Sequence, residues 1–171
     1  MIHLVTGGAR AGKSTFVLLE AEGTNADPIT FVATATAGDD EMAERIRRHR
    51  LERGPRWRTV EEPLALDTLL PALDARAIVV DCLTLWVANL MFAAPDVPDA
   101  DVEAAIDRMV SALGRVRAPI WLVTNEVGLG IVPGDALSRR YRDLLGRCNQ
   151  RVAARADRVT MVVSGLPLRL K

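Results

Sequence analysis

The sequence predicts an α/β domain in which a mostly parallel β-sheet carries helices on both faces. Short apolar segments rich in β-branched residues alternate with longer helical patterns along the chain. These segments are nearly continuous in their hydrophobicity, which is typical of strands buried on both sides in a parallel sheet. A glycine-rich turn joins the first of them directly to a helix. No repeat, low-complexity tract or linker divides the chain, so residues 1–171 are expected to form one domain.

The strands are predicted from apolar segments rich in β-branched residues. They are Ile2–Thr6, Ile29–Thr34, Ala77–Asp81, Ile120–Thr124 and Val159–Ser164. The helices are predicted from the longer patterns between them: Lys13–Ala21, Asp40–Arg53, Leu64–Leu73, Leu83–Phe92, Ala100–Arg117 and Ala136–Ala156. The segment at 83–92 is apolar almost all round, which indicates either a buried helix or part of a subunit interface.

Composition and charge exclude several classes of protein. Lys and Arg together number 22, as do Asp and Glu, so no net positive field favours nucleic acid as a partner. No apolar run approaches the roughly 18 residues that span a bilayer, and the N-terminus lacks the basic region and cleavage site of a signal peptide. Cys82 and Cys148 are isolated and are expected to be reduced core thiols. These features predict a cytoplasmic protein that does not insert into membranes.

The most informative motif follows the first predicted strand directly. It consists of Gly7, Gly8, Ala9, Arg10, Ala11, Gly12, Lys13 and Ser14, which fit the pattern G-x-x-x-x-G-K-[ST]. Its glycines allow backbone N–H groups to turn inward around a phosphate, and the helix that starts near Lys13 adds the positive end of its dipole. Lys13 is expected to reach the β and γ phosphates of a nucleoside triphosphate, and the Ser14 hydroxyl to ligate Mg²⁺.

Two further observations favour this interpretation over a chance match in a glycine-rich turn. Lys13 and Lys171 are the only lysines among the 22 basic residues, which suggests that an ammonium is needed at the internal position. Asp81 ends the apolar segment Ala77–Asp81, where a parallel sheet would bring it toward the same edge as the loop. Asp81 is predicted to hold Mg²⁺ with Ser14, although Asp is also a favoured N-cap and could serve only to begin the next helix.

The predicted helix Asp40–Arg53 opens with acidic residues and ends with basic ones, in line with the helix dipole. Met42, Ile46 and His49 share one face, so one interpretation is an amphipathic helix with His49 packed beneath it. The other interpretation uses charge, because arginines surround the histidine: Arg45, Arg48, Arg50 and Arg53. Neighbouring cations disfavour imidazolium, and a neutral His49 near the α-phosphorus of a nucleotide could attack it to form a covalent intermediate. His3, inside the first strand, is expected to be structural.

Other polar groups stand at predicted strand ends. The segment Thr124–Pro133 carries Asn125, Glu126 and glycines, and it could either position a substrate hydroxyl or simply turn the chain. Weaker candidates for nucleotide contact are Ala33, Thr34, Ala35 and Glu61. The Glu61 carboxylate could accept hydrogen bonds from a guanine edge or a ribose, or lie on the surface. Core packing is the expected role of the three tryptophans, Trp57, Trp86 and Trp121.

Together these features resemble the bifunctional adenosylcobinamide kinase / adenosylcobinamide-phosphate guanylyltransferase family of cobalamin biosynthesis. The resemblance covers essentially the whole chain and keeps the family's order. Its segments are TGGARAGKS, DDEMAERIRRHR, VDCLTLWVANL, LVTNEVGLGIVP, GRCNQRVAARAD and VVSGLPLRLK. The glycine-rich loop is shared with many proteins, whereas the DDEM…H helix together with the TNEVG…GIVP segment is highly specific.

The resemblance implies a P-loop NTPase fold of RecA-like type, a homotrimer and two reactions. The first would phosphorylate the aminopropanol hydroxyl of adenosylcobinamide with ATP or GTP. The second would place GMP from GTP on His49 and pass it to the corrinoid phosphate, giving adenosylcobinamide-GDP and pyrophosphate. The resemblance also implies that Lys13 and His49 are catalytic residues. The positions that it assigns to the nucleotide site are the loop Gly7 to Ser14, Ala33, Thr34, Ala35, Arg50, Leu51, Glu52, Arg53, Glu61 and Asp81.

Departures from the family's pattern are small. Ala11 stands where Ser is common, which leaves the cradling amides intact. Arg48 precedes His49 where some relatives have a second histidine, and Asp81 replaces the Glu of some members and should ligate Mg²⁺ comparably. Two other functions are kept as alternatives. One is a small-molecule kinase that transfers only the γ-phosphoryl group, and the other is a nucleotide-dependent switch that governs a protein partner.

Overall fold

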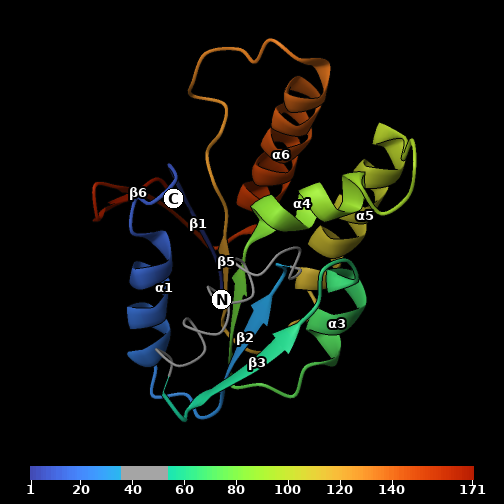
Figure 1. Cartoon of the computed structure of the whole chain (residues 1–171). Coiled ribbons are helices and arrows are strands. Elements are labelled where there is room, and N and C mark those ends of the chain that lie inside the picture. The colour runs from blue at the N-terminus through green and yellow to red at the C-terminus, as the bar shows by residue number, and fades with distance from the viewer. Residues whose placement is uncertain (36–53) are drawn as a thin grey trace.

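The computed structural model describes residues 1–35 and 54–171, whose strands form one seven-stranded sheet in the order β3-β2-β4-β5-β1-β6-β7 (Figure 1). The strands are β1 (Ile2–Gly7), β2 (Ile29–Ala33), β3 (Trp57–Glu61), β4 (Ala77–Asp81), β5 (Ile120–Val123), β6 (Arg158–Val163) and β7 (Leu166–Arg169). Every neighbouring pair is parallel except β6 and β7. The predicted mostly parallel sheet is confirmed.

The two strands at the edges of the sheet, β3 and β7, are absent from the predicted set. The β3 sequence WRTVE is only partly buried, so it lacks the continuous apolar run of the central strands. All four residues of β7 are exposed, and the strand pairs with β6 through a turn at Ser164 and Gly165, whose φ angles are 51° and 81°. Positive φ at both turn residues is typical of a tight hairpin. Because Ser164 belongs to this turn, β6 ends at Val163 and the predicted end at Ser164 is wrong.

The helices that the structure describes are α1 (Lys13–Glu22), α3 (Leu66–Ala72), α4 (Leu83–Met91), α5 (Asp99–Leu113) and α6 (Ala136–Arg155). The predicted start of α3 at Leu64 is wrong, because the Glu62 carboxylate accepts the N–H groups of Leu64 and Ala65 (2.9 and 2.8 Å) before the helix begins at Leu66. The predicted helix Asp40–Arg53 lies outside the described residues.

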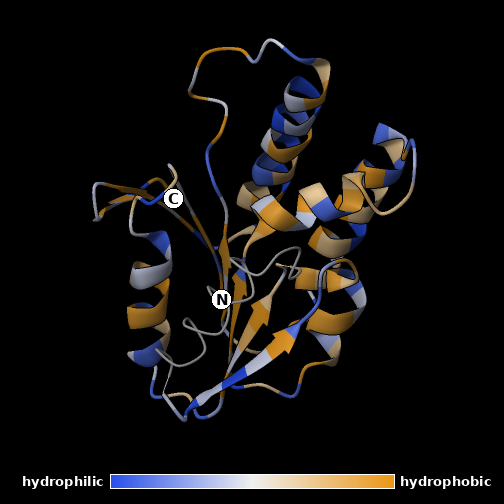
Figure 2. Cartoon of the chain, in the orientation of Figure 1, coloured by the Kyte–Doolittle hydropathy of each residue, from blue (hydrophilic) through white to orange (hydrophobic). Residues whose placement is uncertain are grey.

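Helices cover both faces of the sheet, as predicted (Figure 1). On one face, Val17 and Ala21 of α1 belong to a core cluster with Val5, Val79 and Trp121 of the strands. On the other face, α3, α4, α5 and α6 form a larger core cluster over the alternate strand residues, which include Leu4, Ile78, Val80, Ile120 and Leu122. The central strands are hydrophobic along their length for this reason (Figure 2).

Most expectations about core residues are confirmed. Trp86 and Trp121 are 1% and 2% exposed. Trp57 lies only at the margin of the core, where its indole N–H donates to the Glu22 carboxylate (3.0 Å). α4 packs mainly as a buried helix, which favours the first of the two interpretations of that segment. Cys148 is a buried free thiol, whereas the free thiol of Cys82 is only partly buried.

His3 and Lys171 both take structural roles. His3 is buried in β1, with Nε2 2.8 Å from Thr160 Oγ1 and Nδ1 3.1 Å from Glu20 Oε2. Lys171 places its ammonium at the C-terminal end of α6, where it satisfies carbonyls that have no partner within the helix. Nζ donates to the carbonyls of Ala153, Ala154 and Ala156 at 3.2, 3.2 and 2.6 Å.

Among the helices of residues 1–35 and 54–171, none is both long and apolar enough to cross a membrane.

Candidate active site

The carboxyl ends of β1, β4 and β5 bring the main predicted site residues to one edge of the sheet. β5 pairs with β1 on one side and with β4 on the other. The phosphate loop leaves β1, Asp81 ends β4, and the segment with Asn125 follows β5. Ligands of open α/β sheets bind at this edge, so the topology places these groups where a nucleotide would lie.

The phosphate loop can adopt its path only with glycine at two positions. Gly7 has a φ of 146°, and a Cβ atom there would lie 2.3 Å from the carbonyl oxygen of Val162. Gly12 has a φ of 97° and lies against the β6–β7 turn, where its Cβ would be 3.2 Å from Gly165 Cα. The Gly165 N–H also donates to the Ala11 carbonyl (2.9 Å). The closing hairpin of the chain therefore supports the loop from behind.

Lys13 begins α1 and is held inside the loop. Its side chain is largely buried, since the residue is 7% exposed, and Nζ donates to the Gly8 carbonyl at 2.6 Å. Burial lowers the pKa of the Lys13 ammonium, and the nearby Asp81 carboxylate offsets part of this effect. An ammonium in this position is already desolvated, which strengthens its attraction for a phosphate.

Ser14 and Asp81 converge on the same point. Ser14 Oγ donates to Asp81 Oδ2 at 2.9 Å, although 67 positions separate them in the chain. A hydroxyl and a carboxylate are hard oxygen ligands that suit Mg²⁺, which commonly takes one or two carboxylates and fills its remaining positions with phosphate and water. In the part of the chain that the structure describes, no three His, Cys, Asp or Glu side chains gather into a closed metal site. The hydroxyl and carboxylate of Ser14 and Asp81 could supply two ligands to a metal ion whose other ligands are phosphate and water.

Thr34 supports this edge from within the fold. It is 0% exposed, and its hydroxyl donates to the Cys82 carbonyl (2.7 Å) and accepts from the Cys82 N–H (2.8 Å). The Asn89 carboxamide donates to the Thr34 and Pro63 carbonyls (2.7 and 3.1 Å). Thr34 joins the end of β2 to the segment after Asp81 and is absent from the described walls of the cavity, whereas Ala33 and Ala35 line it.

A cavity of about 580 Å³ lies over these groups. Its described walls include residues 9–15 of the loop and the start of α1, and Asp81 of β4. Further lining residues were not predicted from the sequence: Phe31, Thr59, Cys82, Thr84, Leu85 and Val123. Cys82 lines the cavity, and burial together with the Asp81 carboxylate raises the pKa of its thiol, which disfavours the thiolate form. Asn125, whose sequence context allowed two interpretations, also lines the cavity.

The remaining predicted site residues fall into two groups. Glu61 is the last residue of β3 and pairs with Ala33 of β2, and Ala33 also pairs with Asp81 of β4. The three residues therefore lie side by side at the ends of neighbouring strands. Glu61 is exposed and is not among the described cavity walls. The others lie outside the described residues: His49, Arg50, Leu51, Glu52 and Arg53.

Solved structures with similar architecture support the fold alone. The RadB recombinase has a TM-score of 0.53 and 15% sequence identity, covering 94% of this chain and 73% of that chain. The flagellar accessory protein FlaH from Methanocaldococcus jannaschii has a TM-score of 0.52 and 16% identity, covering 99% and 77%. The predicted P-loop NTPase fold of RecA-like type is confirmed by this likeness.

Sequence relatives match over the full length. The bifunctional adenosylcobalamin biosynthesis protein CobP of Pseudomonas aeruginosa is 47% identical, over 100% of this chain and 98% of its own. The bifunctional adenosylcobalamin biosynthesis protein CobU of Salmonella typhimurium is 45% identical, and that of Escherichia coli 41%, each over 100% of both chains. Residues 3–170 match the family described as cobinamide kinase / cobinamide phosphate guanyltransferase. The chain therefore belongs to the cobinamide kinase / cobinamide phosphate guanyltransferase family.

Proposed function

We propose that this enzyme phosphorylates adenosylcobinamide with ATP or GTP and then transfers GMP from GTP to adenosylcobinamide phosphate. The observation that carries the proposal is the match of residues 3–170 to a family whose description names both a kinase and a guanyltransferase. The cavity supports it, because a buried ammonium and a hydroxyl–carboxylate pair meet beside a loop with the geometry of a phosphate site.

In the kinase step, the oxygen of the acceptor hydroxyl forms a bond to the γ-phosphorus. The bond between that phosphorus and the β–γ bridging oxygen breaks, the nucleoside diphosphate leaves, and the hydroxyl proton passes to solvent. Lys13 and the backbone N–H groups of the loop hold the β and γ phosphates and stabilise the charge that develops on the leaving group. Ser14 and Asp81 would hold Mg²⁺, which when bound offsets the charge of the phosphate oxygens.

In the transferase step, we propose His49 as the nucleophile. A neutral imidazole nitrogen forms a bond to the α-phosphorus of GTP. The bond between that phosphorus and the α–β bridging oxygen breaks, and pyrophosphate leaves. The proton on the other ring nitrogen passes to solvent. A phosphate oxygen of adenosylcobinamide phosphate then bonds to the same phosphorus, the phosphorus–nitrogen bond breaks, and the ring regains its proton. The support for His49 is the family resemblance and the arginines beside it in the sequence.

The same resemblance supports a cytoplasmic homotrimer that binds small-molecule substrates, with GTP, ATP, adenosylcobinamide and its phosphate as the expected ligands. We include the trimer in the proposal, and light scattering of the purified protein tests it. A mass of one chain or of two chains would contradict the trimer without affecting the assignment of the two reactions.

The decisive experiment is mass spectrometry of the intact protein after incubation with GTP and Mg²⁺. We expect an acid-labile adduct with the mass of one GMP, on the peptide that contains His49. The chain has only two histidines, so the His3→Gln variant is a matched control that should keep the adduct while His49→Ala loses it. An adduct that persists in His49→Ala would contradict the proposed nucleophile.

Pyrophosphate release separates the proposal from a simple kinase, since transfer of a γ-phosphoryl group produces none. Turnover that depends on a corrinoid separates it from a nucleotide-dependent switch. We expect both signals from the wild-type protein supplied with GTP and adenosylcobinamide.

A further inference from the structure

The end of β5 emerges in the middle of the nucleotide-binding edge. Within the sheet, Val123 is opposite Val5 of β1 on one side and Asp81 of β4 on the other. The chain that leaves β5 therefore runs between the phosphate loop and the carboxylate of the Ser14–Asp81 pair. Asn125 lies in this stretch and lines the same cavity as the loop and Asp81.

The backbone of Asn125 is held from both sides by side chains of the flanking helices. Its N–H donates to Thr84 Oγ1 of α4 at 2.8 Å. Its carbonyl accepts from Nδ2 of Asn149 in α6 at 3.1 Å. Asn149 is itself buried, and its Oδ1 accepts from Thr124 Oγ1 at 2.8 Å, so the carboxamide of Asn149 is used at both ends. These hydrogen bonds fix the backbone of Asn125 and therefore the point at which its side chain is attached.

The Asn125 side chain is not used in the same way. Within residues 1–35 and 54–171, its carboxamide makes no hydrogen bond, whereas both of its backbone polar groups are paired with side chains. A primary carboxamide offers two N–H donors and one acceptor oxygen. At the wall of a cavity built around an ammonium and backbone amides, its N–H donors are the groups suited to an anionic oxygen.

We propose that Asn125 is a catalytic residue of the kinase step, in which its carboxamide N–H donates to an oxygen of the γ-phosphoryl group. The inference rests on the proposed function and deepens it by separating the two reactions. Lys13 reaches the β and γ phosphates in loops of this type. Ser14 and Asp81 would hold a metal ion at the same end of the triphosphate, where it would offset the charge of the phosphate oxygens. Asn125 follows β5, whose last residue Val123 pairs with Asp81, and it lines the same cavity as Asp81. We therefore place its carboxamide at the outer end of the triphosphate, beside the γ-phosphoryl group.

The donor matters most while the γ-phosphoryl group moves. As the acceptor oxygen bonds to the γ-phosphorus and the bridging bond breaks, charge is redistributed over the three γ oxygens, and a fixed N–H group stabilises it without reorganisation. In the transferase step the γ group leaves unchanged as part of pyrophosphate. A donor at the γ position therefore accelerates the kinase step selectively.

The test compares Asn125→Ala and Asn125→Asp with the wild-type protein in both reactions. Because the fixing hydrogen bonds use the backbone of Asn125, neither substitution removes them. For Asn125→Ala we expect kcat of the kinase step to fall about 100-fold with the nucleotide KM within about threefold of wild type. We expect GTP-dependent labelling of the protein to stay within about threefold. Asn125→Asp should lower the kinase rate further, because a carboxylate repels the phosphate. Gln150→Ala, on the exposed side of α6, is the control and should match wild type in both.

Three other results would each contradict one part of the proposal. Kinase activity in Asn125→Ala close to wild type would exclude the role of the carboxamide. An equal loss of kinase and labelling rates, with an unchanged melting temperature, would show that Asn125 does not act selectively on the γ group. If wild type itself shows neither activity, the proposed function fails, which is distinct from a failure at Asn125 alone.

Discussion

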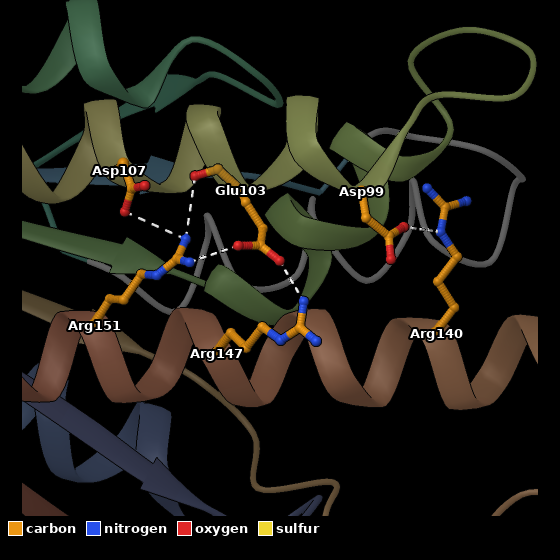
Figure 3. A network of polar contacts seen from close by, with 6 residues as sticks. All are labelled: Asp99, Glu103, Asp107, Arg140, Arg147 and Arg151. Carbon is orange, nitrogen blue, oxygen red and sulfur yellow. Dashed lines mark hydrogen bonds and ion pairs between the residues drawn. The ribbon is translucent and has the colours of Figure 1, made fainter.

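Two charged regions of this protein are built in opposite ways. At the nucleotide-binding edge, Lys13 is nearly buried and its ammonium is bonded to a backbone carbonyl. Between α5 and α6, carboxylates and arginines pair along the surface (Figure 3). The members of this α5–α6 ladder are Asp99, Glu103 and Asp107 of α5 and Arg140, Arg147 and Arg151 of α6.

The two regions differ in what surrounds each charge. Within the ladder, Arg151 lies 2.6 Å from one oxygen of Glu103 and 3.3 Å from Asp107, and Arg147 contacts the other oxygen of Glu103. Hydrogen bonds from Arg151 and Arg147 lower the pKa of the Glu103 carboxyl. At Lys13, by contrast, burial dominates and lowers the pKa of a cation. The charges of the ladder are therefore paired with one another, whereas the charge of Lys13 is held in a desolvated position where, in the proposed function, it binds a ligand. We expect this desolvation to lower the stability of the fold.

The largest expected effect is the loss of activity when the buried Lys13 is replaced. Lys13→Met should lower the rate of both reactions by on the order of 10²- to 10³-fold, because it removes the cation that we propose binds the β and γ phosphates. The midpoint of unfolding in urea should stay the same or rise, since a desolvated ammonium is lost. Steady-state kinetics and urea unfolding measure the two quantities.

Lys171→Met is the matched control for Lys13→Met, because Lys171 is the only other lysine and its ammonium bonds carbonyls at the end of α6. It should leave both reaction rates unchanged and lower stability. A Lys13→Met variant that unfolds much more readily than wild type would contradict the idea that the nucleotide edge trades stability for function.

The next effect concerns the backbone that holds the charge. Gly7→Ala should destabilise the fold by about 3 kcal/mol or prevent it from forming, because the new Cβ would meet the Val162 carbonyl at 2.3 Å and the φ of 146° is strained for alanine. Gly8→Ala is the comparison, since nothing lies within 4 Å of its Cβ, and its thermal midpoint should stay close to wild type. Equal melting temperatures for the two variants would refute this account of the loop.

A smaller effect is expected at His3, where it tests whether burial changes the pKa more than the pairing with Glu20 does. Burial lowers the pKa of His3 below its usual 6.5, although the Glu20 carboxylate raises it in part. The unfolded chain then binds the proton more tightly than the folded one, so stability is complete above about pH 6.5 and declines as the pH falls from there toward the folded pKa.

Urea midpoints at pH 7.5 and pH 5.5 measure this decline. His3→Gln, which cannot titrate, should show a smaller difference between the two pH values than wild type. A larger difference in the variant would mean that the attraction of Glu20 outweighs burial.

The smallest effect is expected in the ladder. Asp99→Asn removes the carboxylate that lies 2.5 Å from Arg140, yet both side chains are partly exposed and Arg140 also donates to the Val97 carbonyl. Stability should change by no more than about 1 kcal/mol, and less at high salt. A loss of several kcal/mol, measured by urea unfolding at low and high salt, would break the contrast between the two regions.

Local pattern was enough to predict the central strands and the phosphate loop. β1, β2, β4 and β5 are buried on both faces, so their apolar runs are visible in the sequence. The edge strands β3 and β7 bury less, and their residues carry no comparable signal. Thr34 was expected at the nucleotide, but the spacing of residues does not reveal that its hydroxyl turns inward to bond Cys82.

By itself, the sequence determined which residue types meet a phosphate, because glycines, lysine and serine within one short loop are neighbours whatever the rest of the chain does. The position of Asp81 at the end of an apolar segment also predicted it as a partner of Ser14, but only the tertiary structure decided the strand order that brings distant groups together. The strand order puts β5 between β1 and β4, and this order brings Asp81 within 2.9 Å of Ser14 and Asn125 to the same cavity wall. The physical reason is that strand order follows from how helices and strands pack over the whole core, which is a property of long-range contacts and not of any short segment.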